Sequence, residues 1–287
     1  MRINGKRFTL TYPDGNTRAF TMSFDDGTHQ DGGVMELCRK YGMGCTFAPN
    51  TAFIDGSRGG FNHLGYYVTV NRQTPETFAA FYRGFEIAGH THTHPGLVNV
   101  PDEEMKKEVA DSVACLSSLV GYEVRGFTYP NNSYDVRVIS FLKKYGIVYA
   151  RTTDQTCAFD PPEDFLMWHP TIHDHDPRAL DLVDECVRSR KPGLKVFYSW
   201  GHAYEFDKPD ANFSDGKRWE DFEKLLAKVA GTKKFWCVSN IEVYDYLTAA
   251  KALVYGEDSV FNPSAFPIHA RVDGKKTVIP AGGALKL

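Results

Sequence analysis

The chain has 287 residues, 42% of them hydrophobic and 24% charged, a composition typical of a globular protein large enough for one α/β domain or two small ones. Its 33 basic and 36 acidic residues give a formal net charge of −3. These charges form no long run, which argues against a nucleic-acid partner and against a polybasic membrane anchor. A small or neutral molecule is therefore the expected partner.

Targeting and cysteine patterns add two further expectations. The N-terminus lacks the apolar core of a secretory signal, and no apolar stretch approaches the length of a membrane span, so we expect a cytoplasmic protein. The six cysteines occur singly and mostly within apolar segments, which favours reduced, packed thiols over a disulfide framework. The oligomeric state stays open.

Short apolar runs alternate with amphipathic stretches from residue 18 to residue 255, which predicts repeated βα units. Strands are expected at 18–24, 45–48, 85–88, 126–129, 147–150, 165–168, 195–200 and 235–238. Helices are expected at 33–41, 75–85, 101–120, 134–145, 179–190, 217–229 and 241–253. About eight strands with crossover helices predict an α/β fold of the (β/α) barrel type. The glycine-rich stretch 54–64 is expected to be a mobile loop at the barrel rim.

The pattern changes after Gly256. Residues 266–272, the turn Asp273-Gly274 and residues 276–279 predict a β-hairpin. We therefore expect a barrel domain over 1–255 and a C-terminal β extension over 256–287 that packs on the barrel.

Polar residues follow the predicted strands, and a barrel of this type carries its functional groups where strands end. Asp25 and Asp26 follow the first predicted strand, where two charges cost stability unless a cation lies beside them. His90 and His94 are four residues apart, so a helical turn would aim both rings at one point, with His92 facing away. Such a short pattern alone would favour a packing or surface role. Beside the acidic doublet it predicts a divalent metal, zinc by default, bound by Asp26, His90 and His94.

Two groups would then carry protons. Asp25 is left beside the metal as the base that takes a proton from the attacking water. His202 follows another predicted strand and is our candidate for the acid that protonates the leaving group. The alternative for His202 is a histidine that holds a loop in place.

The sequences SFDDG at 23–27 and HTHTH at 90–94 resemble the first two motifs of the NodB-homology polysaccharide deacetylases, carbohydrate esterase family 4. The resemblance implies a distorted (β/α) barrel of about seven strands, with Asp25 as catalytic base and Asp26 as metal ligand. The third motif aligns at Pro130, but Thr128 stands where the family has the arginine that orients the base. The fourth motif, around Trp168 and Asp174, and the fifth, at 197–202, match loosely.

Three further assignments depend on this comparison. Arg151, at the end of the fifth predicted strand, is our hypothesis for the missing guanidinium; the alternative is an ion pair with a surface carboxylate such as Asp154. The resemblance implies that the backbone N–H of Tyr129 helps hold the oxyanion, although Tyr129 also suits the core. Trp168 and Trp200 are predicted to stack on sugar rings in the pocket.

These features predict a metal-dependent hydrolase that removes acetyl groups from the N-acetylated amino sugars of an oligosaccharide or polysaccharide. The same site would serve O-acetyl esters, which is the second enzymatic alternative. A barrel that binds metal and sugar without turnover is the third, prompted by the absent motif-three arginine and the loose fourth motif. The sugar, its linkage and the chain length are not specified by the sequence.

Overall fold

Strand β3 (Arg18–Asp26) is the central strand of the computed structural model, which describes residues 1–63, 65–207 and 218–287. Seven of its nine residues are buried, as expected for a parallel strand covered on both faces. It belongs to a parallel sheet of order β10-β11-β3-β4-β7, with β12 also paired to β3. The other strands of this sheet are β4 (Thr46–Pro49), β7 (Glu86–Ile87), β10 (Ile172–His173), β11 (Lys195–Gly201) and β12 (Phe235–Cys237).

Backbone hydrogen bonds continue the sheet around a circuit. Strands β8 (Gly126–Thr128) and β9 (Tyr149–Arg151) pair in parallel. Gly89 joins the end of β7 to β8, because its N–H donates to Gly126 at 2.9 Å and its carbonyl accepts from Thr128 at 2.8 Å. Trp168 donates to Ala150 at 2.9 Å and so joins β9 to the segment that leads into β10. Within the described residues β3, β4, β7, β8, β9, β10 and β11 thus form a distorted barrel, while β12 pairs outside the circuit.

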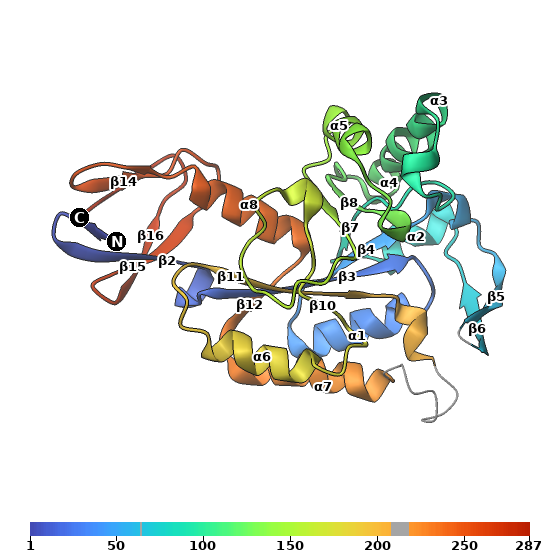
Figure 1. The fold of residues 1–287 in the computed structure, drawn as a ribbon, viewed down its shortest axis with the longest axis horizontal. Helices are drawn as coiled ribbons and strands as arrows, with labels where there is room; N and C mark the ends of the chain where they lie inside the picture. The colour runs from blue at the N-terminus through green and yellow to red at the C-terminus, as the bar shows by residue number, and fades with distance from the viewer. Residues whose placement is uncertain (64, 208–217) are drawn as a thin grey trace.

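Helices cover both sides of these strands (Figure 1). Below the sheet in that view lie α1 (Asp31–Tyr41), α6 (Ala179–Arg188) and α7 (Trp219–Thr232); above it lie α4 (Ser112–Val120), α5 (Val136–Lys144) and α8 (Asn240–Lys251). The predicted helix 101–120 consists of α3 (Asp102–Met105), the π-helical segment η4 (Lys106–Asp111) and α4, and it ends at Gly121 in the left-handed region, φ 78°. Helix α2 (Pro75–Phe81) follows strands β5 (Arg58–His63) and β6 (Tyr66–Asn71) in the chain. Lys217, where a helix was predicted to begin, lies outside the described residues.

Two predicted elements differ in the structure. Residues 165–168 were predicted to form a strand, but Phe165–Met167 is a 3-10 turn, η6, because the Asp164 side chain accepts from Leu166 N at 2.8 Å and caps it. The sixth barrel strand is β10 instead. The predicted rim loop contains β5 (Arg58–His63), which forms an antiparallel hairpin with β6 (Tyr66–Asn71). Two glycines in β5 weaken its strand signal, and Leu64 of the same stretch lies outside the described residues.

Short 3-10 turns connect several elements. They are η1 (Pro13–Gly15), η2 (Thr51–Phe53), η3 (Leu97–Asn99), η5 (Pro130–Asn132) and η7 (Ala203–Phe206). All six cysteines are free thiols. Cys38, Cys45 and Cys186 are buried, as predicted, whereas Cys157 and Cys237 are half-buried and Cys115 is exposed. Among the described helices, none is both long and apolar enough to span a membrane.

A separate antiparallel β module joins the two ends of the chain. The predicted hairpin is confirmed as β15 (Ile268–Val272) and β16 (Lys275–Ile279). Strand β15 also pairs with β2 (Lys6–Thr11), and β2 pairs with β1 (Arg2–Ile3), so residues from the N-terminus complete the same sheet. A second small sheet contains β13 (Val254–Tyr255), β14 (Ser259–Phe261) and β17 (Ala284–Lys286). The division of the chain at residue 255 into two domains stays a prediction.

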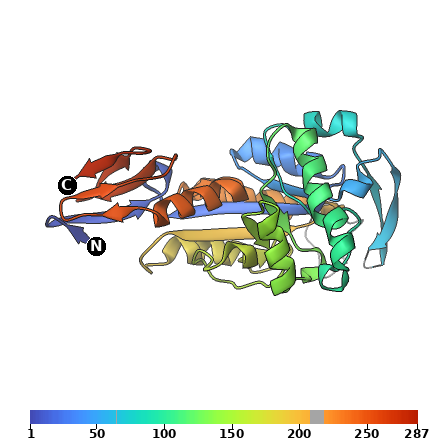
Figure 2. The same ribbon diagram turned by 90° about the horizontal axis from the view of Figure 1, so that it is seen from above.

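The views in Figures 1 and 2 place this β module at one end of the molecule and the β5–β6 hairpin at the other. Strand β2 is connected to β3 by the short turn η1, so the module lies toward the amino end of β3. The carboxyl end of β3, which carries Asp25 and Asp26, points toward the opposite end of the molecule. The candidate site is therefore remote from the β module.

Candidate active site

The last two residues of β3 bring two carboxylates to the rim. Asp25 is 3% exposed, whereas Asp26 is half-buried. Asp26 has a φ of 73°, a left-handed conformation that is uncommon for an aspartate. Arg72 stabilises this turn, since its Nη1 donates to the backbone carbonyl of Asp26. The strand end is thus held in a specific bend that presents the Asp26 carboxylate.

The two histidines arrive on a loop after β7. The predicted helical turn at 90–94 is wrong, because these residues form no helix and both Thr91 and His94 have a φ of 67°. The His94 N–H instead donates to Thr91 Oγ1 at 2.9 Å, which closes a tight turn. This turn brings the rings of His90 and His94 together, with centroids 4.8 Å apart. A tight turn in the loop, and not a helical turn, therefore brings the two imidazole rings together.

Glu108 fixes the middle of this loop from the π-helical segment η4. Its carboxylate accepts from the backbone N–H groups of His92 and Thr93, at 3.0 and 2.9 Å, and from Thr93 Oγ1 at 2.7 Å. The His92 ring faces away from the other two, as predicted, and contacts Thr51 Oγ1 at 2.9 Å. π-helical turns are often found at functional sites, and here one supplies the carboxylate that holds the histidine loop.

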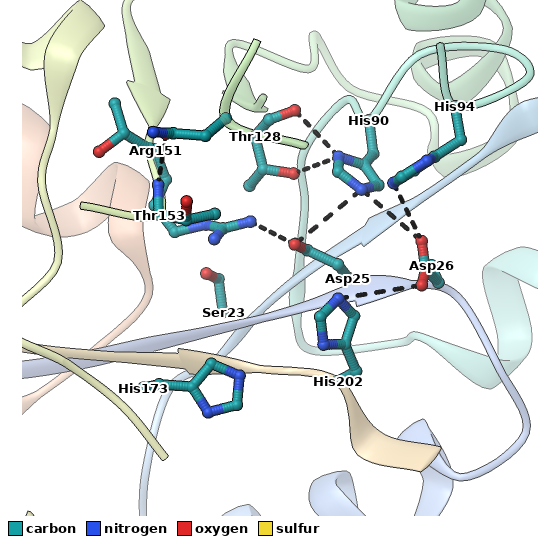
Figure 3. A network of polar contacts seen from close by, with 12 residues as sticks. Ser23, Asp25, Asp26, His90, His94, Thr128, Arg151, Thr153, His173 and His202 are labelled. Atoms are coloured by element: carbon teal, nitrogen blue, oxygen red, sulfur yellow. Dashed lines mark hydrogen bonds and ion pairs between the residues drawn. The ribbon is translucent and has the colours of Figure 1, made fainter. Parts of the chain in front are cut away.

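Asp26, His90 and His94 converge on one point (Figure 3). Asp26 Oδ1 lies 3.6 Å from His90 Nε2 and 3.7 Å from His94 Nε2. Metal–ligand bonds of roughly 2.0–2.2 Å in a tetrahedral site place neighbouring donor atoms about 3.3–3.6 Å apart. The spacing and the two-imidazole, one-carboxylate donor set therefore fit a divalent metal.

Thr128 sets the orientation of the His90 ring. His90 Nδ1 lies 2.9 Å from the backbone carbonyl of Thr128 and 2.6 Å from its Oγ1. A carbonyl can only accept, so Nδ1 carries the proton and Nε2 presents its lone pair toward Asp26. Burial lowers the pKa of His90, against the opposing effect of Asp25 and Asp26, and favours the neutral ring that a metal requires.

Arg151 contacts Asp25 directly, as the hypothesis for the missing guanidinium predicted (Figure 3). Burial alone would raise the pKa of Asp25, but the charge of Arg151, assisted by His90 and His202, lowers this pKa to about 2. Asp25 is therefore ionised at neutral pH. The alternative partner, Asp154, instead accepts from Asn132 Nδ2 at 2.9 Å and from the Tyr134 hydroxyl at 3.2 Å.

Asp25 is close to the histidines without being part of the donor trio. Its Oδ2 lies 3.9 Å from His90 Nε2. Its Oδ1 is buried and accepts no hydrogen bond from any residue that the structure describes. A buried carboxylate oxygen without a donor is costly, so this atom is available for a proton or a water molecule.

His202 approaches the trio from the end of β11. Its Nε2 lies 4.0 Å from Asp26 Oδ2, and its Nδ1 lies 3.4 Å from Glu205 Oε1. Burial would lower the pKa of His202, but Glu205, Asp26 and Asp25 raise this pKa to about 10. In the absence of a metal charge the ring is thus protonated at neutral pH. Glu205 was not predicted from the sequence; the signal available was a carboxylate three residues after a strand-end histidine, on the turn η7.

The structure contradicts the oxyanion contact implied for Tyr129. Its backbone N–H already donates to the Arg151 carbonyl at 3.0 Å, as part of the β8–β9 pairing, so this donor faces the neighbouring strand. The side chain is a core aromatic that donates from Oη to the Leu166 carbonyl at 2.8 Å and stacks on Tyr134. Tyr129 therefore has the core role that was its alternative.

The predicted sugar-stacking role of Trp168 and Trp200 also fails. Trp168 is 2% exposed and Trp200 is 8% exposed, so neither ring has a free face of useful size. Trp168 packs against Tyr149 and Tyr198, while Trp200 lies 4.3 Å from the Arg151 guanidinium carbon. Trp200 thus helps to position the arginine that contacts Asp25.

The fold and this cluster define a class: parallel α/β barrels that carry two histidines and two aspartates at the carboxyl ends of their strands. A family model described as polysaccharide deacetylase matches residues 13–150. This match covers just under half of the chain and agrees with the resemblance inferred from the motifs.

Solved structures share the fold at low sequence identity. A protein assigned as a polysaccharide deacetylase from Mycobacterium smegmatis has a TM-score of 0.59 at 16% identity, covering 85% of this chain and 94% of that one. The Xyl-CE4 domain of a multidomain xylanase from the hindgut metagenome of Trinervitermes trinervoides has a TM-score of 0.50 at 15% identity, covering 82% and 93%. A search of curated protein sequences found no significant match.

Proposed function

We propose that the protein is a metal-dependent hydrolase that removes acetyl groups from N-acetylated amino sugars of an oligosaccharide or polysaccharide. The observation that carries the proposal is the position of Asp25. This ionised carboxylate is buried, held by Arg151, and adjacent to the trio Asp26, His90 and His94 without belonging to it. A spare base beside a three-donor metal cluster is the arrangement of a hydrolase rather than of a structural metal site.

Asp26, His90 and His94 would hold the metal, and zinc is the default because the donors are two imidazoles and one carboxylate. When bound, a divalent ion lowers the pKa of a coordinated water and polarises the substrate carbonyl. Thr128 holds His90 in the tautomer that leaves Nε2 available. Arg151 keeps Asp25 ionised, so that this carboxylate stays a base in a buried setting.

The proton transfers follow from the two groups outside the trio. Asp25 takes a proton from the water as its oxygen bonds to the acetyl carbon. His202, charged through its contact with Glu205, donates a proton to the amine nitrogen as the C–N bond breaks. The products are acetate and the free amino sugar. The general acid matters most for an amide, since an amine leaves poorly without a proton.

Two alternatives use the same residues. An O-acetyl ester would place an alcohol as the leaving group, which needs less help from His202. A barrel that binds metal and sugar without turnover was prompted by the absence of the motif-three arginine and by the loose fourth motif. The contact between Arg151 and Asp25 argues against the first of these reasons, because a guanidinium holds the base from another strand.

The test is acetate release by the metal-loaded protein from N-acetylated and O-acetylated oligosaccharides, with a chelated sample as reference. We expect release from the N-acetylated series, lost on chelation. Asp25→Asn should abolish release and keep the metal, whereas His90→Ala should lose both. Asp154→Asn, an exposed aspartate outside the cluster, is the matched control. Acetate release by Asp25→Asn at the wild-type rate would remove Asp25 as the base.

A further inference from the structure

Four basic side chains gather on one side of the sheet β1-β2-β15-β16. The register pairs Arg2 with Arg7 across β1 and β2. Arg271 pairs with Lys276 across β15 and β16, and with Thr9 across β15 and β2. Thr9 and Arg7 are two residues apart on β2, so their side chains point to the same side of the sheet. We name this set the basic face; its members are Arg2, Arg7, Arg271 and Lys276.

The basic face is open to solvent. Three of its four residues are exposed, and Arg271 is half-buried. The opposite side of the same strands belongs to the core, since Phe8 and Ala270 are each 1% exposed. The β module forms one end of the molecule (Figure 2), and the exposure of these cations shows that the barrel does not cover them.

Both cross-strand pairs of the basic face set like charges directly opposite each other, which destabilises a sheet. The side chains of Arg271 and Lys276 also approach one point above Gly15. A Cβ atom at Gly15 would lie 2.7 Å from Arg271 Nη2 and 3.0 Å from Lys276 Cε. The fold therefore concentrates positive charge here at a cost to its own stability.

No ion pair within the described part of the chain offsets this charge. None of the four cations forms one with a described residue, whereas exposed lysines on the barrel do. The neighbouring Asp273 accepts from the backbone N–H of Arg7 at 2.8 Å and not from a basic side chain. Asp14 lines the same shallow cavity as Lys276 but lies outside ion-pair distance. An external anion would relieve the repulsion that these contacts leave in place.

The excess of positive charge extends over the whole β module. Residues 1–17 and 254–287 contain seven lysines and arginines but four aspartates and glutamates, although the complete chain has 33 basic and 36 acidic residues. Because these cations come from both ends of the chain, no basic run reveals them in the sequence. A polyanion would therefore meet attraction at the module and repulsion over the rest of the surface.

We propose that the basic face binds an anionic polysaccharide. The guanidinium fork of arginine bonds two oxygens of one carboxylate, sulfate or phosphate group. None of the described residues on this side of the sheet is Phe, Tyr or Trp, so the bases of a single-stranded nucleic acid have no ring to stack on. Val278 is the large apolar side chain exposed on this side, which is too little to enter a bilayer.

The choice of a polysaccharide rests on the proposed hydrolysis of a glycan by the barrel, whereas the charge of the ligand rests on the basic face alone. The module lies toward the amino end of β3, and the trio Asp26, His90 and His94 lies at the carboxyl end. A polymer held on the basic face thus leaves the trio open. Polymer binding and acetate release can consequently be measured separately.

The experiment measures binding of the full chain to immobilised polygalacturonate by biolayer interferometry, at about 50 mM and about 200 mM salt. We expect the wild type to bind more weakly at the higher salt concentration, because bound cations displace counterions from the polyanion. The triple variant Arg7→Gln, Arg271→Gln, Lys276→Gln should raise the dissociation constant by roughly 10-fold or more. Its acetate release from a short N-acetylated oligosaccharide should equal that of the wild type.

The double variant Arg2→Gln, Arg7→Gln changes exposed residues alone and serves in case Arg271 is needed for folding. It should also bind polygalacturonate more weakly, and its melting temperature should not fall, because the substitution removes a like-charge pair. A lower melting temperature with unchanged polymer binding would assign these cations a structural role and overturn the proposal.

The matched control is the triple variant Lys40→Gln, Lys191→Gln, Lys224→Gln, which removes the same charge from exposed ion pairs on the barrel and should bind like the wild type. Equal affinities of the two triple variants, or no binding by the wild type, would overturn the proposal. Binding to duplex DNA or phosphatidylglycerol vesicles in place of polygalacturonate would overturn the choice of polysaccharide. Polymer binding that depends on the basic face, in a protein that releases no acetate, would support this face and contradict the proposed hydrolysis.

Discussion

Arg151 reaches Asp25 from strand β9, one strand away from the position where the family resemblance expects an arginine. At that expected position, on β8, Thr128 contacts the His90 ring instead. Two neighbouring strands therefore position different groups of the site. Arg151 on β9 holds the base Asp25, and Thr128 on β8 holds the His90 ring. Substitutions at Arg151 and at Thr128 test these two contacts separately.

Replacing Arg151 by alanine should lower kcat/KM for acetate release by roughly 10²- to 10⁴-fold, the usual range for loss of a general base. The buried Asp25 would lose the charge that keeps it ionised, so its pKa would rise. Breaking a buried ion pair also destabilises the fold, by about 3–5 kcal/mol. Steady-state kinetics and denaturation measure the two effects, and bound metal should not change.

Lys191→Ala is the matched control, because Lys191 pairs with Asp160 in an exposed ion pair. Such pairs contribute only about 0–1 kcal/mol, and this one lies outside the site. Arg151→Lys should recover part of the activity if charge is what matters. Full activity of folded Arg151→Ala would show that Asp25 needs no guanidinium.

Thr128→Val should weaken metal binding by about 10-fold, since residues that orient a ligating histidine typically change affinity by roughly 10- to 100-fold. The substitution removes the hydroxyl 2.6 Å from His90 Nδ1 and keeps the backbone carbonyl. Competition against a chelator measures the dissociation constant. Thr152→Val removes a hydroxyl from His169 in the same manner, outside the site, and should bind metal like the wild type. Equal affinities in the two variants would contradict the role given to Thr128.

Glu205→Gln should lower kcat on an N-acetyl substrate by roughly 10- to 100-fold, because His202 loses the carboxylate that favours its protonated form. The loss should be smaller on an aryl acetate, whose leaving group departs without a proton. Comparing both substrates in both proteins measures the difference. Glu223→Gln, which alters an exposed pair with Lys40, serves as control. An identical loss on both substrates would argue against general-acid support by Glu205.

The buried carboxyl group of Glu86 is expected to make the free energy of unfolding depend on pH. Burial raises the pKa of this carboxyl to about 7, although it accepts from Tyr149 Oη and Thr46 Oγ1, both at 2.6 Å. A raised carboxyl pKa means that the folded state holds the proton more tightly than the unfolded state does. The contribution is therefore present below the unfolded-state pKa of about 4.5 and is lost as the pH rises through about 7.

The free energy of unfolding of the wild type relative to Glu86→Gln should consequently fall by about 3 kcal/mol between pH 4.5 and pH 8. Denaturant titrations at a series of pH values measure this difference, and the comparison cancels other titrating groups. Glu223→Gln should run parallel to the wild type above about pH 6, because its contacts with Lys40 and Tyr41 lower the pKa of Glu223 and confine its effect to more acidic pH. Parallel profiles for the wild type and Glu86→Gln would show that Glu86 is not responsible.

Strand positions were the most predictable part of the fold, because buried parallel strands are short apolar runs between amphipathic helices. Convergence of Asp26, His90 and His94 followed from this, since strand ends meet at one face of a barrel. The loop geometry at 90–94 was not predictable, because it depends on left-handed residues and on Glu108 from a distant segment. The β5–β6 hairpin was missed for a related reason, as glycines obscure its alternation.

Other site features depend on contacts that sequence patterns do not report. Whether the Tyr129 N–H is available is decided by pairing with Arg151 across β8 and β9. The burial of Trp168 and Trp200 is decided by neighbours from several strands. The contact of Arg151 with Asp25 could be proposed from the sequence, because both residues were predicted to lie at the carboxyl ends of strands.

The β module has a consequence for how the chain acquires its structure. Arg7 and Asp273 are bonded across 266 residues of sequence, so β2 and β15 can meet only after the barrel has brought the two ends near each other. Closing so long a loop in an unstructured chain carries a high entropic cost, which the prior collapse of the barrel would reduce. During synthesis on the ribosome this sheet would be the last part to assemble, and an early pause would leave the edge of β2 exposed to association with other chains.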